Sequence, residues 1–260
     1  MFRLVSRQSV KVLFAILGAI VLASMARGAT PAKQASKASP AERAGLWQAA
    51  RSHLVAAPDD ERVLNDAVAA AKQLERDPVT VKSAIRAYRE LSEILHKSNR
   101  EEAPMLAAKY AGAARRLGLV GRPMKIFGTL PNGDRFDPSN LEGKVVLVDF
   151  WATWCGPCRK ELPNVKRNYE KYHARGFEVV GVSLDTEADA LEAFLSKEQI
   201  GWPVLMGNER TGAGWATPLA IYYGVQSVPT AILVDQQGKV VSLNARGETL
   251  TRRLEELLGK

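Results

Sequence analysis

Cysteine is scarce in this chain of 260 residues: there are only two, and both lie in the stretch WATWCGPCRKE, Trp151 to Glu161. Two cysteines cannot build a framework of several disulfides. A structural metal site needs about four ligands, and the three histidines, His53, His96 and His173, are scattered along the sequence. We therefore expect no metal site, which leaves a redox couple or a structural disulfide as interpretations of the pair.

Dense basic segments with interleaved aromatic residues are also absent, so a nucleic-acid-binding groove is not expected. The formal charge is +8, but Arg3, Arg7 and Lys11 lie in the first 26 residues, which contain no acid; the rest of the chain carries +5. The composition, 46% hydrophobic and 25% charged, is ordinary for a globular protein with one large domain or two smaller ones.

The N-terminus has a basic start, an apolar run from Val12 to Ser24 and then the small residues of SMARGA. This order is typical of a secretory signal peptide. The apolar run of 13 residues is shorter than the roughly 20 needed to cross a bilayer. We interpret residues 1–28 as a cleaved signal peptide, with an uncleaved membrane anchor as the alternative. No cysteine follows the run, which excludes lipid attachment there. Export would place the cysteines where disulfides persist.

Residues 29–39 are rich in Ala, Ser, Lys and Pro and are interpreted as a linker. A capping-box pattern at Ser39 to Glu42 then starts the first of four helical patterns, which predict a small helical domain over residues 40–120. Its aromatic and leucine stripe is interpreted as the core of that domain; a groove for a partner peptide is the alternative. The four patterns share no repeat signature.

The pattern alternates between strand and helix over residues 121–260. A turn at Pro131 to Gly133 predicts a hairpin between residues 126–129 and 134–136. Further strands are expected at residues 145–151, 177–183, 202–206, 230–234 and 240–243. One helix is expected directly after the cysteines, and three more are expected at residues 187–197, 216–223 and 248–258. The alternation predicts the α/β class, with a central mixed sheet flanked by helices on both faces.

The two cysteines lie where a buried strand gives way to a helix. Cys155 is expected at the helix N-terminus and exposed, and Cys158 one turn further and more covered. The helix dipole and free N–H groups favour a thiolate at Cys155, which makes it the expected nucleophile, and Cys158 can then resolve a mixed disulfide. Pro157 fits the first turn, whose N–H groups have no partner within the helix. A structural disulfide explains the pair poorly, because so short a loop removes little unfolded-state entropy.

The segment VVLVDFWATWCGPC, together with Val228-Pro229-Thr230, resembles the thioredoxin superfamily. The preceding hairpin, the block LEGKVVLVDFWATWCGPCRKELP and the extra helix and strand before Tyr222 make the chain similar to the TlpA/ResA-like branch of exported thiol-disulfide oxidoreductases. The resemblance covers residues 121–260, about half of the chain, and implies a thioredoxin-like fold. A peroxiredoxin resembles this fold, but its motif Pro-x-x-x-Thr-x-x-Cys requires a threonine three residues before the cysteine, where this chain has Ala152. The mismatch argues against peroxide as the main substrate.

The resemblance also implies roles for single residues. Pro229 would be the cis-proline beside the sulfurs, and the backbone of Val228 would pair with the substrate strand. Asp149 matches the buried acid of thioredoxin, a proton acceptor for Cys158 that the exported branch often lacks; a core acid without a catalytic role is the alternative. Glu161 matches an acid near the site of ResA-like proteins, with an ordinary helix-face charge as the alternative.

Trp154, Gly156 and Pro157 are expected to form an apolar rim on which partner proteins dock, whereas Trp151 is expected in the core. Together these residues predict an exported, periplasmic or extracytoplasmic thiol-disulfide oxidoreductase that reduces other exported proteins. No cofactor is expected other than the redox-active disulfide itself. The expected partners are exported proteins that contain disulfides and a membrane protein that donates electrons. The alternatives are a binding or scaffold protein acting through its helical domain, and a disulfide oxidase or isomerase.

Overall fold

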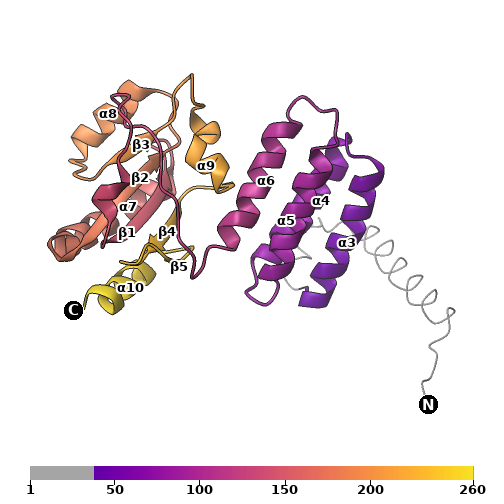
Figure 1. Ribbon diagram of the computed structural model, residues 1–260, viewed down its shortest axis with the longest axis horizontal. Helices are drawn as coiled ribbons and strands as arrows, with labels where there is room; N and C mark the ends of the chain where they lie inside the picture. Colours follow the sequence, from indigo (N-terminus) through magenta and orange to yellow (C-terminus); the bar gives the residue numbers. More distant parts are fainter. Residues whose placement is uncertain (1–37, 260) are drawn as a thin grey trace, which may run out of the picture.

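The computed structural model describes residues 38–259, which form one lobe of helices and one lobe built around a sheet (Figure 1). The signal peptide or anchor and most of the linker predicted above lie outside the described residues. Helices and strands carry the labels of Figure 1. Within residues 38–259, no helix combines the length and the apolar character needed to cross a bilayer.

The helical lobe begins at the capping box that the sequence predicts. The Ser39 hydroxyl accepts the Glu42 N–H at 3.3 Å, and the Glu42 carboxylate accepts the Ser39 N–H at 2.7 Å. Asp60 caps the next helix by accepting two backbone N–H groups. The helices are α3 (Pro40–Ala56), α4 (Glu61–Glu75), α5 (Val81–Leu95) and α6 (Ala103–Leu117), and each contacts the next.

The aromatic and leucine stripe of these helices forms their own core, as predicted. Trp47, Leu54 and Leu91 are buried in it. The rings of Tyr88 and Tyr110 stack with their centroids 6.0 Å apart, which joins α5 to α6. Burial of this continuous stripe stabilises helices that would be marginal in isolation at about 15 residues each.

The second lobe contains a five-stranded mixed sheet with the order β3-β2-β1-β4-β5. Its strands are β1 (Val145–Trp151), β2 (Phe177–Ser183), β3 (Val204–Met206), β4 (Thr230–Val234) and β5 (Val240–Ser242). The first three strands run parallel, and β4 is antiparallel to both of its neighbours. Every residue of β2 is buried, as its apolar run predicts for a strand covered on both faces. The predicted fold class, a thioredoxin-like α/β fold preceded by a helical region, is confirmed.

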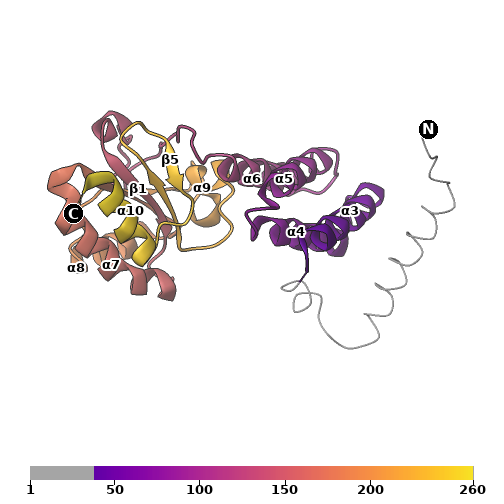
Figure 2. The ribbon, with the colours of Figure 1, turned by 90° about the horizontal axis from the view of Figure 1, so that it is seen from below.

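Helices lie on both sides of this sheet (Figure 2). Among them, α7 and α10 contact each other, and α9 contacts α6 of the helical lobe. The helices are α7 (Gly156–Tyr172), α8 (Ala188–Lys197), α9 (Pro218–Tyr222) and α10 (Glu248–Leu258), with short 3-10 turns η2 (Pro138–Leu141), η3 (His173–Arg175) and η4 (Gly214–Ala216).

The predicted hairpin at residues 126–136 is reduced to a turn with a single bridge, Thr129 to Arg135. The reason is that Thr129 also pairs with the sheet. Its carbonyl accepts the Met206 N–H at 2.9 Å, and its hydroxyl donates to the Met206 carbonyl at 2.9 Å. The segment therefore attaches to the edge of the sheet beside β3 instead of extending as two strands.

Candidate active site

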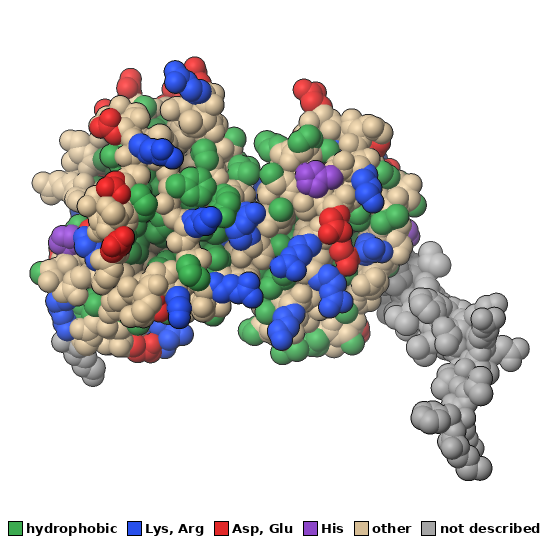
Figure 3. Space-filling view, in the orientation of Figure 1, with side chains coloured by type: hydrophobic (Ala, Val, Ile, Leu, Met, Phe, Trp, Pro, Cys, Tyr) green, Lys and Arg blue, Asp and Glu red, His purple; other side chains and the backbone are tan. Residues whose placement is uncertain are grey.

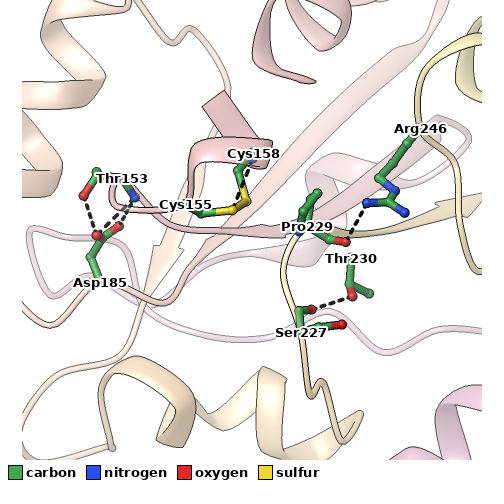
Figure 4. Close-up of a disulfide and its surroundings, with 8 residues drawn as sticks. All are labelled: Thr153, Cys155, Cys158, Asp185, Ser227, Pro229, Thr230 and Arg246. Atoms are coloured by element: carbon green, nitrogen blue, oxygen red, sulfur yellow. Dashed lines mark hydrogen bonds between the residues drawn. A yellow bond between two sulfur atoms is a disulfide. The ribbon is translucent and has the colours of Figure 1, made fainter. Parts of the chain in front are cut away.

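The two cysteines form a disulfide at the start of α7, directly after β1 (Figure 4). Cys155 is the N-cap of α7, and its sulfur accepts the Cys158 N–H at 3.2 Å. Gly156 and Pro157 occupy the first helical positions, where a missing N–H costs no hydrogen bond. The free N–H groups and the dipole of α7 thus point at the sulfur of Cys155, which favours a negative charge there once the disulfide is reduced.

The expectation that Cys155 is exposed and Cys158 more covered is wrong for this oxidised structure. Cys155 is 5% exposed and Cys158 is 6% exposed. The Cys155 sulfur turns back over the first turn of α7 to bond with Cys158, so both side chains join the main core cluster. A partner must therefore approach through the small area of sulfur that remains open.

The Val228–Pro229 peptide bond is cis, as the resemblance implies. Pro229 lies beside the disulfide, in the segment that leads into β4 (Figure 4). Its carbonyl accepts the Nη1 group of Arg246 at 3.2 Å, and the Arg246 Nε group donates to Asn244 at 2.7 Å. The hydroxyl of Thr230 donates to the Ser227 carbonyl at 2.8 Å. Hydrogen bonds therefore hold this segment on both sides of the proline.

Asp149 is partly buried, while the other residues of β1 are fully buried, and it lines a small cavity that Cys158 also lines. The protein around this cavity removes the carboxyl group from most of the solvent. Burial is the main cause that raises the pKa of Asp149 from its ordinary 3.8 to about 7. The negative charge of Glu161 adds to the rise, and the positive charge of Arg246 opposes it. Asp149 therefore carries a proton part of the time near neutral pH, as a group that exchanges protons with a thiol requires.

Glu161 does not lie free on the helix face. Its Oε1 atom accepts the Gly247 N–H at 2.7 Å and the Asn164 side-chain amide at 2.8 Å. It thereby links α7 to the start of α10, next to Arg246. This position explains how Glu161 influences Asp149 by its charge while making no hydrogen bond with it among the described residues.

The predicted rim residues lie at the surface around the disulfide. Trp154 is 58% exposed, Pro157 is exposed and Gly156 is partly exposed, whereas Trp151 is buried as expected. A second indole that the sequence interpretation missed, Trp215 of η4, lies beside Trp154 with the ring centroids 6.4 Å apart. Nothing in the local sequence connects two tryptophans 61 positions apart; only the fold brings them together.

Asp185 is a further residue that the sequence interpretation missed. It is buried and accepts hydrogen bonds from the Thr153 N–H and, at 2.6 Å, from the Thr153 hydroxyl (Figure 4). It also accepts the Ser183 hydroxyl at 2.7 Å. These bonds fix the turn that carries Trp154. The strand pattern of the sequence could have indicated Asp185. It follows the carboxyl end of β2, and the cysteines follow the carboxyl end of β1. Because these two strands are parallel, their carboxyl ends lie at the same edge of the sheet.

Across residues 38–259, no three His, Cys, Asp or Glu side chains gather in a way that could hold a metal ion. The reactive groups that the structure brings together are the sulfur pair, the cis-proline segment and the Asp149 carboxyl group. A sulfur pair with a proton acceptor behind it can attack a disulfide, hold the mixed disulfide and release the reduced product.

Comparison with known proteins identifies relatives of the sheet-containing lobe. A family profile described as AhpC/TSA family matches residues 120–243. Thiol-disulfide oxidoreductase ResA of Bacillus thuringiensis subsp. konkukian (strain 97-27) is 34% identical over 128 residues, which span 49% of this chain and 69% of the relative. ResA of Bacillus subtilis (strain 168) is 33% identical over 112 residues, 43% of this chain and 59% of the relative.

Solved structures give matches to the same half of the chain. The thioredoxin domain of a thiol-disulfide oxidoreductase from Bacteroides vulgatus has a TM-score of 0.48 at 28% identity, covering 54% of this chain and 97% of that domain. A structure described as a putative thiol:disulfide interchange protein DsbE from Chlorobium tepidum has a TM-score of 0.44 at 31% identity. The match covers 53% of this chain and 95% of that protein.

Proposed function

Since this chain belongs to the family of thiol-disulfide oxidoreductase ResA, we propose that it reduces disulfides of exported proteins through Cys155 and Cys158. The observation that carries the proposal is the placement of Cys155 as the N-cap of α7, bonded to Cys158 and flanked by the cis-proline. This placement supplies a nucleophile, a resolving thiol and a backbone segment on which a substrate can align.

In the first step, the reduced Cys155 thiolate attacks one sulfur of the substrate disulfide. A new S–S bond joins Cys155 to the substrate, and the other substrate sulfur leaves as a thiolate that takes up a proton. The N-terminus of α7 favours the thiolate of Cys155 over its protonated form.

In the second step, Cys158 loses its proton to Asp149 across the cavity that both residues line. The Cys158 thiolate then attacks the sulfur of Cys155, and the substrate leaves with both of its sulfurs reduced. The chain gives up two electrons and ends in the disulfide form that the structure contains. A pKa of about 7 suits Asp149 to accept a proton near neutral pH and to release it before the next cycle.

Substrate binding is assigned to the cis-proline segment and the rim. The substrate chain pairs in an extended conformation with the backbone of Val228, a mode that uses main-chain hydrogen bonds for affinity. Trp154, Gly156 and Pro157 provide the adjoining apolar surface. Gly156 leaves open space above the disulfide, since a Cβ there would meet nothing within 4 Å.

The direction of transfer is proposed to be reduction. The Gly156-Pro157 pair and Asp149 are thioredoxin-like, and the residues between the cysteines influence how strongly the thiolate is stabilised and hence the reduction potential. An exported reductase needs electrons from the cytoplasmic side, so a membrane protein is proposed as the donor. The order of basic, apolar and small residues at the N-terminus supports export.

The test is the reduction potential of the Cys155/Cys158 pair, measured by equilibration with dithiothreitol or glutathione buffers and quantification of free thiols. We expect a value near about −270 mV, that of a reductase; a value near about −120 mV would mark an oxidant and overturn the direction. If no reversible couple is found, a scaffold role of the helical lobe becomes the better explanation. The Cys158→Ser variant should accumulate mixed disulfides through Cys155, which mass spectrometry can identify.

A further inference from the structure

The helical lobe contacts the sheet-containing lobe at the chain segment that leads to the cis-proline. Helix α6 lies against α9 in both views (Figures 1 and 2). From the end of α9 at Tyr222, only five residues separate the contact from Val228. The curated relatives described above match about half of this chain, so their resemblance leaves the role of the helical lobe open.

The contact between α6 and this segment is a direct approach of two backbones. A Cβ atom at Gly112 of α6 would lie within 2.8 Å of the Ile221 carbonyl oxygen, the Tyr222 carbonyl oxygen and the Gly224 nitrogen. Gly224 has a φ of +56°, and a Cβ there would lie within 2.7 Å of backbone atoms of α6. Only glycine permits this spacing on both sides, so the segment cannot move far relative to α6.

Side chains reinforce the same contact. The guanidinium group of Arg115 lies 4.0 Å from the centroid of the Tyr222 ring and also donates to the Tyr222 carbonyl. Leu243, which follows β5, packs against the cores of both lobes. The two lobes are thus joined by apolar, cation–π and hydrogen-bonding contacts around α9 and not only by the chain connection.

A polar chain within the helical lobe extends toward the cis-proline. Arg116 pairs with Glu75 at 2.7 Å, and Glu75 accepts the Tyr88 hydroxyl at 2.8 Å. Burial raises the pKa of that hydroxyl, and the side chain of Gln226, which lies beside it, opposes the rise. Gln226 is two residues before Val228, so groups of α4, α5 and α6 surround the approach to the proposed substrate-pairing segment.

From these contacts we propose that the helical lobe is a buttress that holds residues 224–228 in the conformation in which Val228 pairs with a substrate chain. Gly112, Gly224 and Arg115 are its positioning residues. The inference rests on the proposed pairing of Val228 with substrate. Ordering this segment before a substrate arrives removes an entropic cost that binding would otherwise carry.

The buttress matters only for substrates that pair along the segment. A polypeptide disulfide must align its chain with Val228, whereas a small aromatic disulfide reaches the sulfur of Cys155 without doing so. Loosening the contact should therefore slow the reduction of insulin disulfides and leave the reduction of 5,5′-dithiobis(2-nitrobenzoic acid) unchanged. A general loss of structure would slow both.

The test compares Gly112→Ala with Gly45→Ala in the full chain, with both substrates. Both glycines lie within helices, but a Cβ at Gly45 meets nothing within 4 Å. The helix propensity gained is the same in both variants, so any difference between them comes from the lobe contact. We expect kcat/KM for insulin to fall about tenfold in Gly112→Ala alone, equal to about 1.4 kcal/mol of alignment energy.

No selective loss in Gly112→Ala would overturn the buttress. If Gly112→Ala loses both activities equally, the Arg115→Met variant decides between the explanations, because it removes the contact with Tyr222 without crowding the backbones. A loss of activity confined to insulin in this variant supports the proposal. Any other result contradicts it. Inactivity of the unmodified chain toward both substrates would instead refute the proposed reductase function. Hydrogen exchange at residues 224–228 should be faster in Gly112→Ala than in Gly45→Ala.

Discussion

Asp149 and Cys158 line the same small cavity, one from the middle of β1 and the other from the first turn of α7. The disulfide therefore has a carboxyl group across a small cavity from Cys158. Because the pKa of this carboxyl group is raised to about 7, its protonation changes near neutral pH.

The Asp149→Asn variant should resolve mixed disulfides about a hundredfold more slowly, because general-base assistance to Cys158 is lost. The rate in the unmodified chain should rise with pH through about 7, as Asp149 becomes deprotonated, and the variant should lack this inflection. Stopped-flow measurement of product release from a preformed mixed disulfide tests both points. Asp189→Asn, at an exposed position in α8, is the control and should behave like the unmodified chain.

The same substitution should stabilise the oxidised protein at high pH. The folded-state pKa of Asp149 is above its ordinary 3.8, so its contribution to stability is complete below pH 3.8 and is lost as the pH rises to about 7. The full loss corresponds to at most about 4 kcal/mol. Urea unfolding of both proteins should therefore give similar free energies near pH 4 and a higher value for Asp149→Asn at pH 8. Equal pH dependence in the two proteins would contradict this expectation.

Glu161 and Arg246 should shift the pKa of Asp149 in opposite directions. Glu161→Gln removes a negative charge and should lower that pKa, while its amide oxygen still accepts the Gly247 N–H. Arg246→Gln removes the opposing positive charge and should raise it. A carboxyl titration of the oxidised protein by NMR measures both shifts. Shifts of the same sign would show that a structural rearrangement, and not charge, controls the group.

Asp185→Ala should destabilise the protein by about 3 kcal/mol, because it leaves the buried hydroxyl of Ser183 and both donors of Thr153 without their acceptor. It should also increase the mobility of the turn that carries Trp154. Denaturant unfolding and hydrogen exchange at Thr153 measure these effects. Asp137→Ala, in an exposed 3-10 cap, provides a comparison and should cost about 1 kcal/mol.

Trp215→Ala should change stability little, since the side chain is 42% exposed, but it should raise KM for insulin severalfold. The indole of Trp215 faces that of Trp154 beside the disulfide, and such an aromatic pair contributes about 0.5–1.5 kcal/mol to what it binds or orders. Steady-state kinetics with Trp215→Ala and with Trp47→Phe, a substitution in the core of the helical lobe, distinguish a substrate contact from a change in packing.

Local patterns were sufficient to predict the helices and most strands, because each is set by its own periodicity and caps. The sequence predicts β4 at Thr230–Val234 and α10 at Glu248–Leu258 with the bounds that the structure has. The hairpin at residues 126–136 was predicted too long, since Thr129 pairs with Met206, a partner 77 positions away that local turn chemistry does not reveal.

The sulfur pair, Pro229 and Asp149 were found in the sequence because each lies in a motif that resembles a known family. Arg246, Asp185 and Trp215 were not, because their roles depend on contacts between distant segments. Arg246 binds the Pro229 carbonyl from 17 positions away, and no spacing rule links an arginine in a loop to a proline before a strand. The exposure of Cys155 was mispredicted because the disulfide draws its sulfur into the core.

The connection between the two lobes is very short. Helix α6 ends at Leu117, and Val120 already pairs with Val240 of β5. With the glycine contact at α9, the chain is fastened at two points, so the helical lobe cannot swing about a single hinge. Any molecule held by that lobe would sit at a set distance and angle from Cys155.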